Sequence, residues 1–180
     1  MKKIVLVVSL MMVMALNAAQ AAELKVGVVN FQKALNEVEQ GKKAKAALKA
    51  EFDAKQKKLQ IQEDELKKMQ AEFEKQKAVL SQDALMAKQK TFQEKYTDLQ
   101  KNFAGYRDEL VGRESKMTSQ ILQNLKTVVA ALGQKGGFTL VMESSADTVL
   151  YVQSKEDLTD EVIKAYNSKF TGPLKDAGKE

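Results

Sequence analysis

The sequence predicts a mostly α-helical protein in which a long antiparallel helical hairpin, of the coiled-coil type, projects from a small β-containing body. Three observations predict this class. Between Gly41 and Gly105 the chain has no glycine or proline and is dense in strong helix formers. Apolar residues recur there every seven positions, the pattern of a helix that lies along another helix. Short valine-rich segments flank the helical region and are typical of strands.

The N-terminal segment, residues 1–21, has the pattern of a secretory signal peptide. Two lysines form a short basic region, and an apolar run follows from Ile4 to Leu16. Small residues then precede a predicted cleavage between Ala21 and Ala22. A membrane anchor is the alternative, but the run is shorter than the roughly 20 residues that a spanning helix needs. The alanine-rich, basic composition is typical of bacterial proteins, so we expect the mature chain to lie in the periplasm.

The composition excludes several kinds of site. The chain has 180 residues and contains no Cys, His or Trp. Disulfides and thiolate metal sites are therefore excluded, and the commonest general base is missing. Carboxylates cluster between Glu143 and Glu161, but a turn and a helix start account for most of them. We expect no catalytic residue, no cofactor and no metal site, and an enzyme is the least favoured class.

The first element of the body is predicted to be a strand at residues 24–29. Val26 and Val28 fall on one side of this strand. Asn30 follows it and is a good N-cap for a short helix. Gly41 is then predicted to mark a kink or a break between this first piece and the arm.

Residues 41–132 are predicted to form the hairpin arm, because a single amphipathic helix cannot bury its apolar stripe alone. The turn is expected within residues 74–84, with Ser81 as the N-cap of the returning helix. Each helix of about 50 residues would extend about 75 Å. The apolar seam is predicted from seven-residue series on both helices. Its members are Phe52, Leu59, Leu66, Phe73, Leu80, Phe92, Leu99, Phe103 and Leu110.

Polar residues interrupt the predicted seam. Lys55, Gln62 and Gln76 occupy positions that an ideal coiled coil fills with apolar side chains. We therefore expect loose packing along part of the arm and a flexible hairpin. Uniformly slow hydrogen exchange over residues 45–115 would contradict this expectation.

The C-terminal region returns to the body. Glycines end the helical pattern, and two further strands are predicted at residues 138–142 and 148–152, joined as a hairpin. Thr159 is predicted to cap a last helix over residues 159–170, and a flexible tail follows over 171–180.

Residues 22–40 and 133–170 together are thus predicted to form the body. Its three strands make a marginal core, which predicts a homo-oligomer assembled through the strands. The residues expected at this interface are Val26, Val28, Phe138, Leu140, Met142, Val149 and Tyr151.

The charge is unevenly distributed. Residues 42–90 contain 13 Lys and 8 acidic residues, whereas residues 133–180 contain 6 Lys and 8 acidic residues. A basic arm can attract anionic lipid or acidic protein, although a solvated lysine-rich helix face is an equally good explanation. Nucleic acid is not an expected partner, because an exported protein rarely meets it.

The order of these elements resembles the Skp/OmpH family of periplasmic chaperones. The resemblance rests on the Val28-Val29-Asn30 strand end, the segment from Met86 to Phe92 and the Leu140-Val141-Met142 strand, together with the layout of the whole mature chain. It implies a homotrimer in which strands of three subunits form a small β-barrel-like oligomerisation domain. Three helical arms would then surround a central cavity. Members of the family hold unfolded outer-membrane β-barrel proteins there without ATP and deliver them towards the outer membrane.

The resemblance also implies a lipopolysaccharide site built from a lysine and an arginine pair on the arm. Lys95 matches the lysine, but the pair falls at Gly105-Tyr106, with Arg107 adjacent. Only Lys95 and Arg107 are therefore carried over as a contact for lipopolysaccharide or an anionic membrane surface.

Two functions remain open from the sequence. The favoured one is an ATP-independent holdase that prevents aggregation of unfolded outer-membrane proteins. The alternative is a structural coiled-coil adaptor of the cell envelope without chaperone activity, which the heptads alone fit equally well.

Overall fold

The computed structural model describes residues 24–144 and 149–175 of the chain. The element order is β1 (Val26–Val29), α2 (Phe31–Glu37), α3 (Glu39–Gln76), α4 (Gln82–Lys135), β2 (Leu140–Glu143), the short 3₁₀ helix η2 (Ser154–Glu156) and α5 (Thr159–Lys169). The predicted signal peptide and its cleavage between Ala21 and Ala22 lie outside the described residues.

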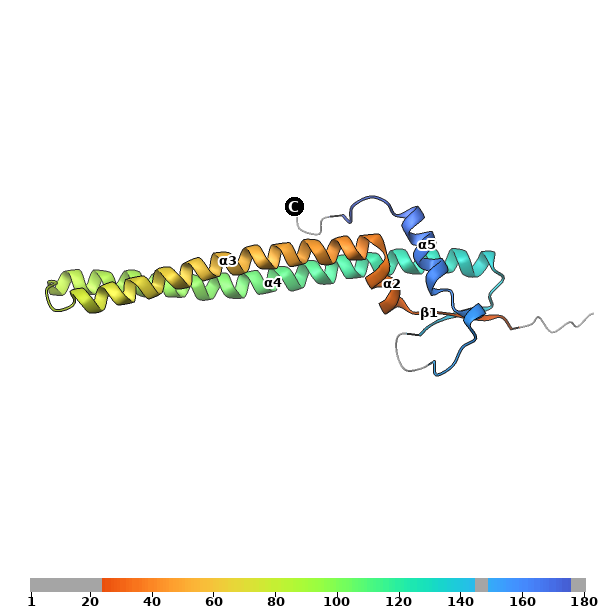
Figure 1. Cartoon of the computed structure of the whole chain (residues 1–180), viewed down its shortest axis with the longest axis horizontal. Helices are drawn as coiled ribbons and strands as arrows, with labels where there is room; N and C mark the ends of the chain where they lie inside the picture. Colours follow the sequence, from red (N-terminus) through yellow and green to blue (C-terminus); the bar gives the residue numbers. More distant parts are fainter. Residues whose placement is uncertain (1–23, 145–148, 176–180) are drawn as a thin grey trace, which may run out of the picture.

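Helices α3 and α4 lie side by side as a long antiparallel hairpin that projects from the body (Figure 1). The chain reverses direction between Lys77 and Ser81, inside the segment where the turn is predicted. Ser81 begins α4 as its N-cap, because its hydroxyl accepts a hydrogen bond from the Ala84 amide at 3.4 Å. Asp83 in the first turn adds a favourable charge at the positive end of the helix dipole.

The two strands pair in parallel where the chain returns to the body. Val26 lies opposite Leu140, and Val29 lies opposite Glu143. This orientation follows from the hairpin. Strand β1 leads towards the arm, α4 comes back, and the turn at Gly136 and Gly137 reverses the chain so that β2 runs in the direction of β1. Gly137 has a φ of +66°, which a glycine adopts without strain.

The prediction of a third strand at residues 148–152 is wrong for the single chain. Residues 149–152 are in neither a strand nor a helix, and β2 pairs with β1 instead of forming a hairpin with them. Leu150 and Tyr151 in this segment are 92% and 83% exposed. The segment has β-forming residues, but it is not part of the described sheet, which consists of β1 and β2. On its other side β1 makes only a single bridge, between Val28 and Asp157.

The core of the body is formed where α5 and α2 pack on α4 (Figure 1). Apolar side chains from five elements are buried together there. They are Val29, Ala34, Val38, Ala44, Met117, Ile121, Leu125, Val128, Leu158, Val162 and Tyr166. Helix α4 contributes most of one side because its apolar stripe continues past the start of α3 into the body. The arm and the body thus share one continuous helix.

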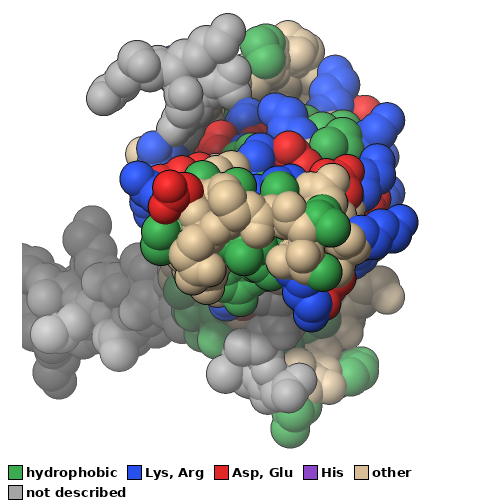
Figure 2. All heavy atoms as spheres, turned by 90° about the vertical axis from the view of Figure 1, so that its left-hand side faces the viewer, with side chains coloured by type: hydrophobic (Ala, Val, Ile, Leu, Met, Phe, Trp, Pro, Cys, Tyr) green, Lys and Arg blue, Asp and Glu red, His purple; other side chains and the backbone are tan. Residues whose placement is uncertain are grey.

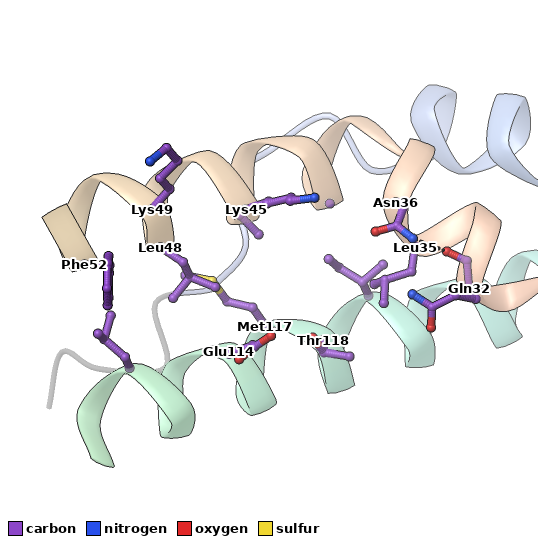
Figure 3. Close-up of a pocket in the computed structure, with 14 residues that line it drawn as sticks. Gln32, Leu35, Asn36, Lys45, Leu48, Lys49, Phe52, Glu114, Met117 and Thr118 are labelled. Atoms are coloured by element: carbon purple, nitrogen blue, oxygen red, sulfur yellow. Dashed lines mark hydrogen bonds between the residues drawn. The ribbon is translucent and has the colours of Figure 1, made fainter. Parts of the chain in front are cut away.

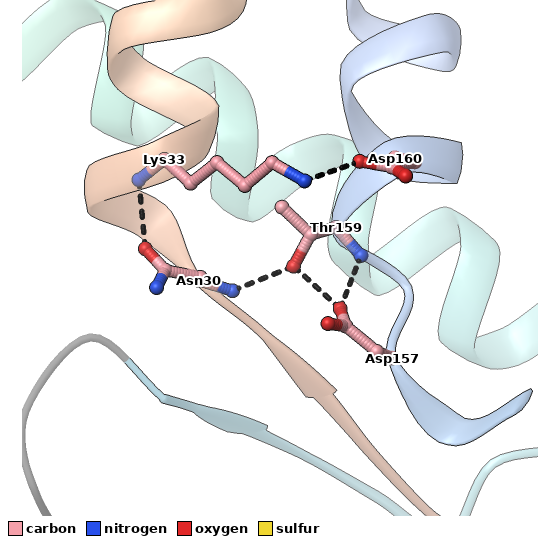
Figure 4. A network of polar contacts seen from close by, with 5 residues as sticks. All are labelled: Asn30, Lys33, Asp157, Thr159 and Asp160. Atoms are coloured by element: carbon pink, nitrogen blue, oxygen red, sulfur yellow. Dashed lines mark hydrogen bonds and ion pairs between the residues drawn. The ribbon is translucent and has the colours of Figure 1, made fainter. Parts of the chain in front are cut away.

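A polar network ties the end of β1 to the start of α5 (Figure 4). The Asn30 amide donates to the Thr159 hydroxyl at 2.9 Å, and that hydroxyl donates to Asp157 at 2.6 Å. Asn30 also caps α2 as predicted, since its side chain accepts from the Lys33 amide at 2.7 Å. The ammonium of Lys33 pairs with Asp160 at 2.8 Å. Thr159 is the first residue of α5, and its hydroxyl belongs to this network. The prediction that Thr159 caps its own helix is therefore wrong.

A second network fixes α5 to the base of the arm. Tyr166 is fully buried, and its hydroxyl donates to Gln40, which is itself 8% exposed. The amide of Gln40 donates to the Gly172 carbonyl at 2.7 Å, and Asn124 donates to the Tyr166 hydroxyl at 3.4 Å. Burial raises the pKa of the Tyr166 phenol, and the hydrogen bond from Asn124 opposes this shift. Each buried polar group of the network thus has a partner.

The break between α2 and α3 falls at Val38, three residues before the predicted position at Gly41. Val38 has extended backbone angles and ends α2, and α3 begins at the next residue. Gly41 is nevertheless needed at this corner. A Cβ at Gly41 would lie 1.9 Å from the carbonyl oxygen of Leu35, so a larger residue would push the two segments apart.

Gly41→Ala is expected to destabilise the protein by about 1–3 kcal/mol, because the backbone at the corner must move to admit the methyl group. Urea unfolding followed by circular dichroism at a fixed protein concentration measures this change. Gly105→Ala is the matched control. Gly105 lies within α4 with no atom near its Cβ position, so alanine should stabilise the helix by about 0.5–1 kcal/mol. Equal effects of the two substitutions would contradict the steric argument.

Candidate functional site

The seam of the arm differs from the predicted heptads at two aromatic positions. Leu66 is buried, and Leu59, Phe73, Leu80, Phe92, Leu99 and Leu110 are half-buried between the helices. Phe52 and Phe103, however, are 52% and 60% exposed. The prediction that these two phenylalanines lie within the seam is wrong. A straight helix has 3.6 residues per turn, so a strict seven-residue series drifts around it, and the inward position passes to neighbours such as Asn102 and Tyr106.

Polar pairs connect α3 and α4 along one flank of the seam. The ion pairs are Glu51–Arg113 at 2.7 Å, Lys55–Glu109 at 2.6 Å and Glu65–Lys95 at 2.8 Å, and Gln62 accepts from Asn102 at 3.3 Å. Two of the three polar seam positions, Lys55 and Gln62, therefore have cross-hairpin partners. The structure does not support the loose packing predicted at these two positions. The pairs connect the two helices at several levels of the arm.

Lys55 is the best-packed member of this flank. Its side chain is 14% exposed, and its ammonium lies 4.3 Å from the centre of the Tyr106 ring. The hydrogen bond to Glu109 raises the pKa of Lys55 and lowers the pKa of Glu109, and desolvation opposes both shifts. Both groups are thus held in their charged forms.

The other flank of the seam is an apolar groove. Its distal part lies between Phe52 and Leu59 on α3 and the facing residues of α4, which include Phe103, Leu110 and Val111. It joins a proximal part at Phe52 and Leu110, which line both. Phe103 and Val111 are 60% and 58% exposed, so the groove opens to solvent. We call the two parts together the arm groove.

The proximal part of the arm groove reaches the base of the arm (Figure 3). Leu48, Phe52 and Met117 lie between α3 and α4, and polar residues of α2 such as Gln32 close the groove near the body. Its volume is about 560 Å³. The charged residues that line the arm groove are Lys45, Lys49, Lys55, Arg107 and Glu114. The rim is therefore basic on balance.

The tip of the arm also exposes apolar side chains. Val79 and Met86 are 83% and 55% exposed. In the end-on view, hydrophobic side chains lie at the tip, and Lys and Arg side chains gather around it, mostly on one side (Figure 2). The sequence did not predict the exposure of four apolar residues of the arm, namely Ile61, Val79, Met86 and Val111. Their positions outside the main apolar stripe are the signal that could have identified them.

Lys95 and Arg107 do not lie together. They are twelve residues apart on one helix, which corresponds to about 18 Å along its axis. Lys95 is paired with Glu65, on the flank of polar pairs, whereas Arg107 lines the arm groove on the other flank. The structure therefore separates the two residues that the resemblance suggested as one anion contact.

The predicted interface residues divide into buried and exposed groups. Val28 is 4% exposed and belongs to the body of its own chain. Val26, Phe138 and Val149 are half-buried. Leu140 and Met142 on β2 are 49% and 41% exposed, and Tyr151 is 83% exposed. Two of the exposed members, Leu140 and Met142, lie on β2, which pairs with β1 on one side only in the described sheet.

Within the described residues, no group of three or more His, Cys, Asp or Glu side chains is placed to hold a metal ion. In the same part of the chain, no helix is both long enough and apolar enough to cross a membrane.

The geometry defines a class of protein in which a long helical arm with an exposed apolar groove extends from a small body with an open sheet edge. Comparison with known proteins gives the family. A model of the family described as outer membrane protein (OmpH-like) matches residues 25–166. The chain therefore belongs to the OmpH-like family.

A solved structure has the same fold. A crystal structure of a protein from Caulobacter crescentus CB15, assigned as an OmpH-like outer membrane chaperone, superposes with a TM-score of 0.79. The two chains are 22% identical, and the match covers 86% of this chain and 90% of the other. A comparison with curated proteins finds no match. Family membership implies a periplasmic or envelope location.

The pairing of Lys55 with Glu109 predicts a pH dependence of arm stability. Because the pKa of Glu109 is lowered in the folded state, the pair stabilises the fold at neutral pH, and this contribution is lost as the pH falls through the lowered pKa, below the ordinary glutamate range of about 4. Glu109→Gln should therefore unfold at lower urea concentration than the wild type at pH 7. The two midpoints should converge once the pH is below that lowered pKa. A difference that stays constant with pH would contradict this assignment.

Proposed function

We propose that this protein is an ATP-independent periplasmic holdase that binds unfolded outer-membrane β-barrel proteins between its arms and prevents their aggregation. The observation that carries the proposal is the row of exposed apolar side chains on a basic arm, namely Phe52, Phe103 and Val111. Unfolded membrane proteins expose apolar segments that otherwise aggregate. An arm that exposes its own apolar side chains, away from its folded core, can contact such segments.

Two forces would act in this binding. Apolar contacts supply short-range attraction, and each one is weak because the arm residues are only partly exposed. The excess of lysine on the arm attracts acidic stretches of a client over a longer range. Several arms that act together retain a chain by multivalency without a single strong site.

Assembly as a homotrimer would provide those arms. The exposed residues around β2, namely Leu140 and Met142, form an apolar strand edge of the kind that proteins usually cover. The 149–152 segment, which follows β2 in the sequence, carries Leu150 and Tyr151, which are 92% and 83% exposed. In the proposed trimer these segments pair between subunits and close a small barrel-like domain, so that the third strand predicted from the sequence forms only on assembly.

A dedicated lipopolysaccharide site at Lys95 and Arg107 is not part of the proposal. The ion pair with Glu65 occupies Lys95, and the two cations lie on different flanks of the arm. Attraction of the basic arm to an anionic membrane surface remains compatible with the charge distribution.

A denatured outer-membrane β-barrel protein diluted from urea should scatter less light when this protein is present. Suppression is expected to be complete near one trimer per client and to need no ATP. It should weaken as salt rises from about 0.05 M to 0.5 M, since the screening length falls below the distances over which the arm charges act. Lack of suppression at low salt would favour the structural adaptor, and suppression independent of salt would remove the electrostatic part of the proposal.

Leu140→Asp combined with Met142→Asp should prevent assembly, because two charges would be buried at the proposed interface. Solution mass from light scattering is expected to fall from three chains to one, with the helical circular dichroism signal retained. Ile61→Asp combined with Met86→Asp is the control, since these exposed residues lie on the arm and not on the sheet. A trimer that survives the β2 substitutions would rule out this edge as the interface.

A further inference from the structure

We propose that the arm groove is a binding site for one extended client segment of about eight residues, in which apolar side chains alternate with polar ones and carboxylates lie at the ends. This inference rests on the proposed holdase function and specifies the site and the kind of segment that it takes. Among the paired residues of the polar flank, Lys55 also lines the site.

The two flanks of the seam differ in chemistry. One flank is occupied by the cross-hairpin pairs of Glu51, Lys55, Gln62 and Glu65, so its side chains are already engaged. The other is lined by apolar side chains whose exposed surface is unfavourable in water. Phe52 on α3 and Phe103 on α4 both line its distal part. Filling the groove would remove this apolar surface from water, which favours binding.

The arm groove is long enough for an extended segment. On α3 it reaches from Gly41 to Leu59, over which the helix rises about 27 Å. An extended chain rises about 3.3 Å per residue, so about eight residues span this length. A strand that crosses a membrane as part of a barrel has about 9–11 residues. The arm groove is thus long enough for most of one such strand.

The alternation of apolar and polar residues in such strands also fits the arm groove. Barrel strands alternate between apolar residues that face lipid and polar residues that face the lumen. In an extended segment the two kinds of side chain point to opposite sides. One apolar row can therefore fill the groove while the polar row remains in water. A segment with the same composition but consecutive apolar residues would leave half of them exposed.

The charge of the groove lining favours a segment with carboxylates at its ends. The lining contains Lys45, Lys49, Lys55 and Arg107 but one carboxylate, Glu114. Lys55 is engaged by Glu109, whereas Lys45 and Arg107 lie at exposed positions near the two ends of the arm groove. Carboxylates at the ends of the bound segment would meet these cations.

The test uses the full-length mature protein and a fluorescein-labelled nine-residue peptide with alternating leucine and serine and a glutamate at each end. Fluorescence anisotropy gives its Kd. The double variant Phe103→Gln/Val111→Gln should raise this Kd about tenfold or more, because two apolar contacts are lost. The control variant Ile61→Gln/Met86→Gln removes two apolar side chains of similar exposure outside the arm groove, and its Kd should stay within about twofold of the wild type. Glutamine is a good helix former, so both variants should keep the wild-type circular dichroism.

A second peptide of identical composition, with its leucines consecutive, should bind more weakly than the alternating one. Equal affinity for the two peptides, an unchanged Kd in the groove variant, or no binding of the alternating peptide to the wild type would each overturn the groove proposal. Phe52→Gln provides an independent variant on the other helix. Suppression of client aggregation by the wild type is measured in parallel. If suppression persists while the groove predictions fail, the holdase function stands without this site, and if the wild type does not suppress aggregation, the proposed function itself fails.

Discussion

The closure of the body by backbone hydrogen bonds at β1 is the constraint on which the rest of the structure depends. Strand β1 pairs with β2 along its length, and the Leu158 amide donates to the Val28 carbonyl at 2.9 Å. Strand β1 is thereby joined to two segments that lie more than a hundred residues later in the sequence. The Asn30–Thr159 bond and the buried Tyr166–Gln40 bond extend this junction to the base of the arm. A long hairpin attached to a small core needs such a junction, because the core alone buries few side chains.

From this junction the arm acquires two chemically different flanks. The register set by the body brings Glu51 to Arg113 and Lys55 to Glu109, which satisfies the polar seam positions on one side. The apolar residues displaced from the seam, Phe52 and Phe103, then remain partly in water on the other side. The same drift of the helical period thus stabilises the hairpin and leaves an open apolar groove. The arm can expose such a surface without loss of its own fold, because Leu66 and the body core keep their packing.

Much of the architecture followed from local sequence signals. The helical hairpin, the turn near Ser81, the Asn30 cap and the helix that begins at Thr159 are all set by interactions within a few residues, such as capping bonds and apolar periodicity. The wrong predictions concern features that depend on a contact between segments far apart in the sequence. The sequence of residues 148–152 favours a strand, but a strand also needs a neighbouring edge, and β2 is paired with β1. Gly41 signalled a break, but the break lies at Val38 because the Leu35 carbonyl passes against Gly41.

The sequence by itself therefore determined the class of the protein: a basic, largely helical chain without the residues for common catalysis, with an apolar seven-residue repeat that requires a partner helix. Only the tertiary structure decided which residues of the arm face its partner and which face water. A heptad pattern specifies a stripe on one helix, whereas the exposure of Phe103 and Val111 depends on the register and the crossing of two helices. That register is set at the body, by the parallel pairing of Val26 with Leu140 and by the bonds around Thr159.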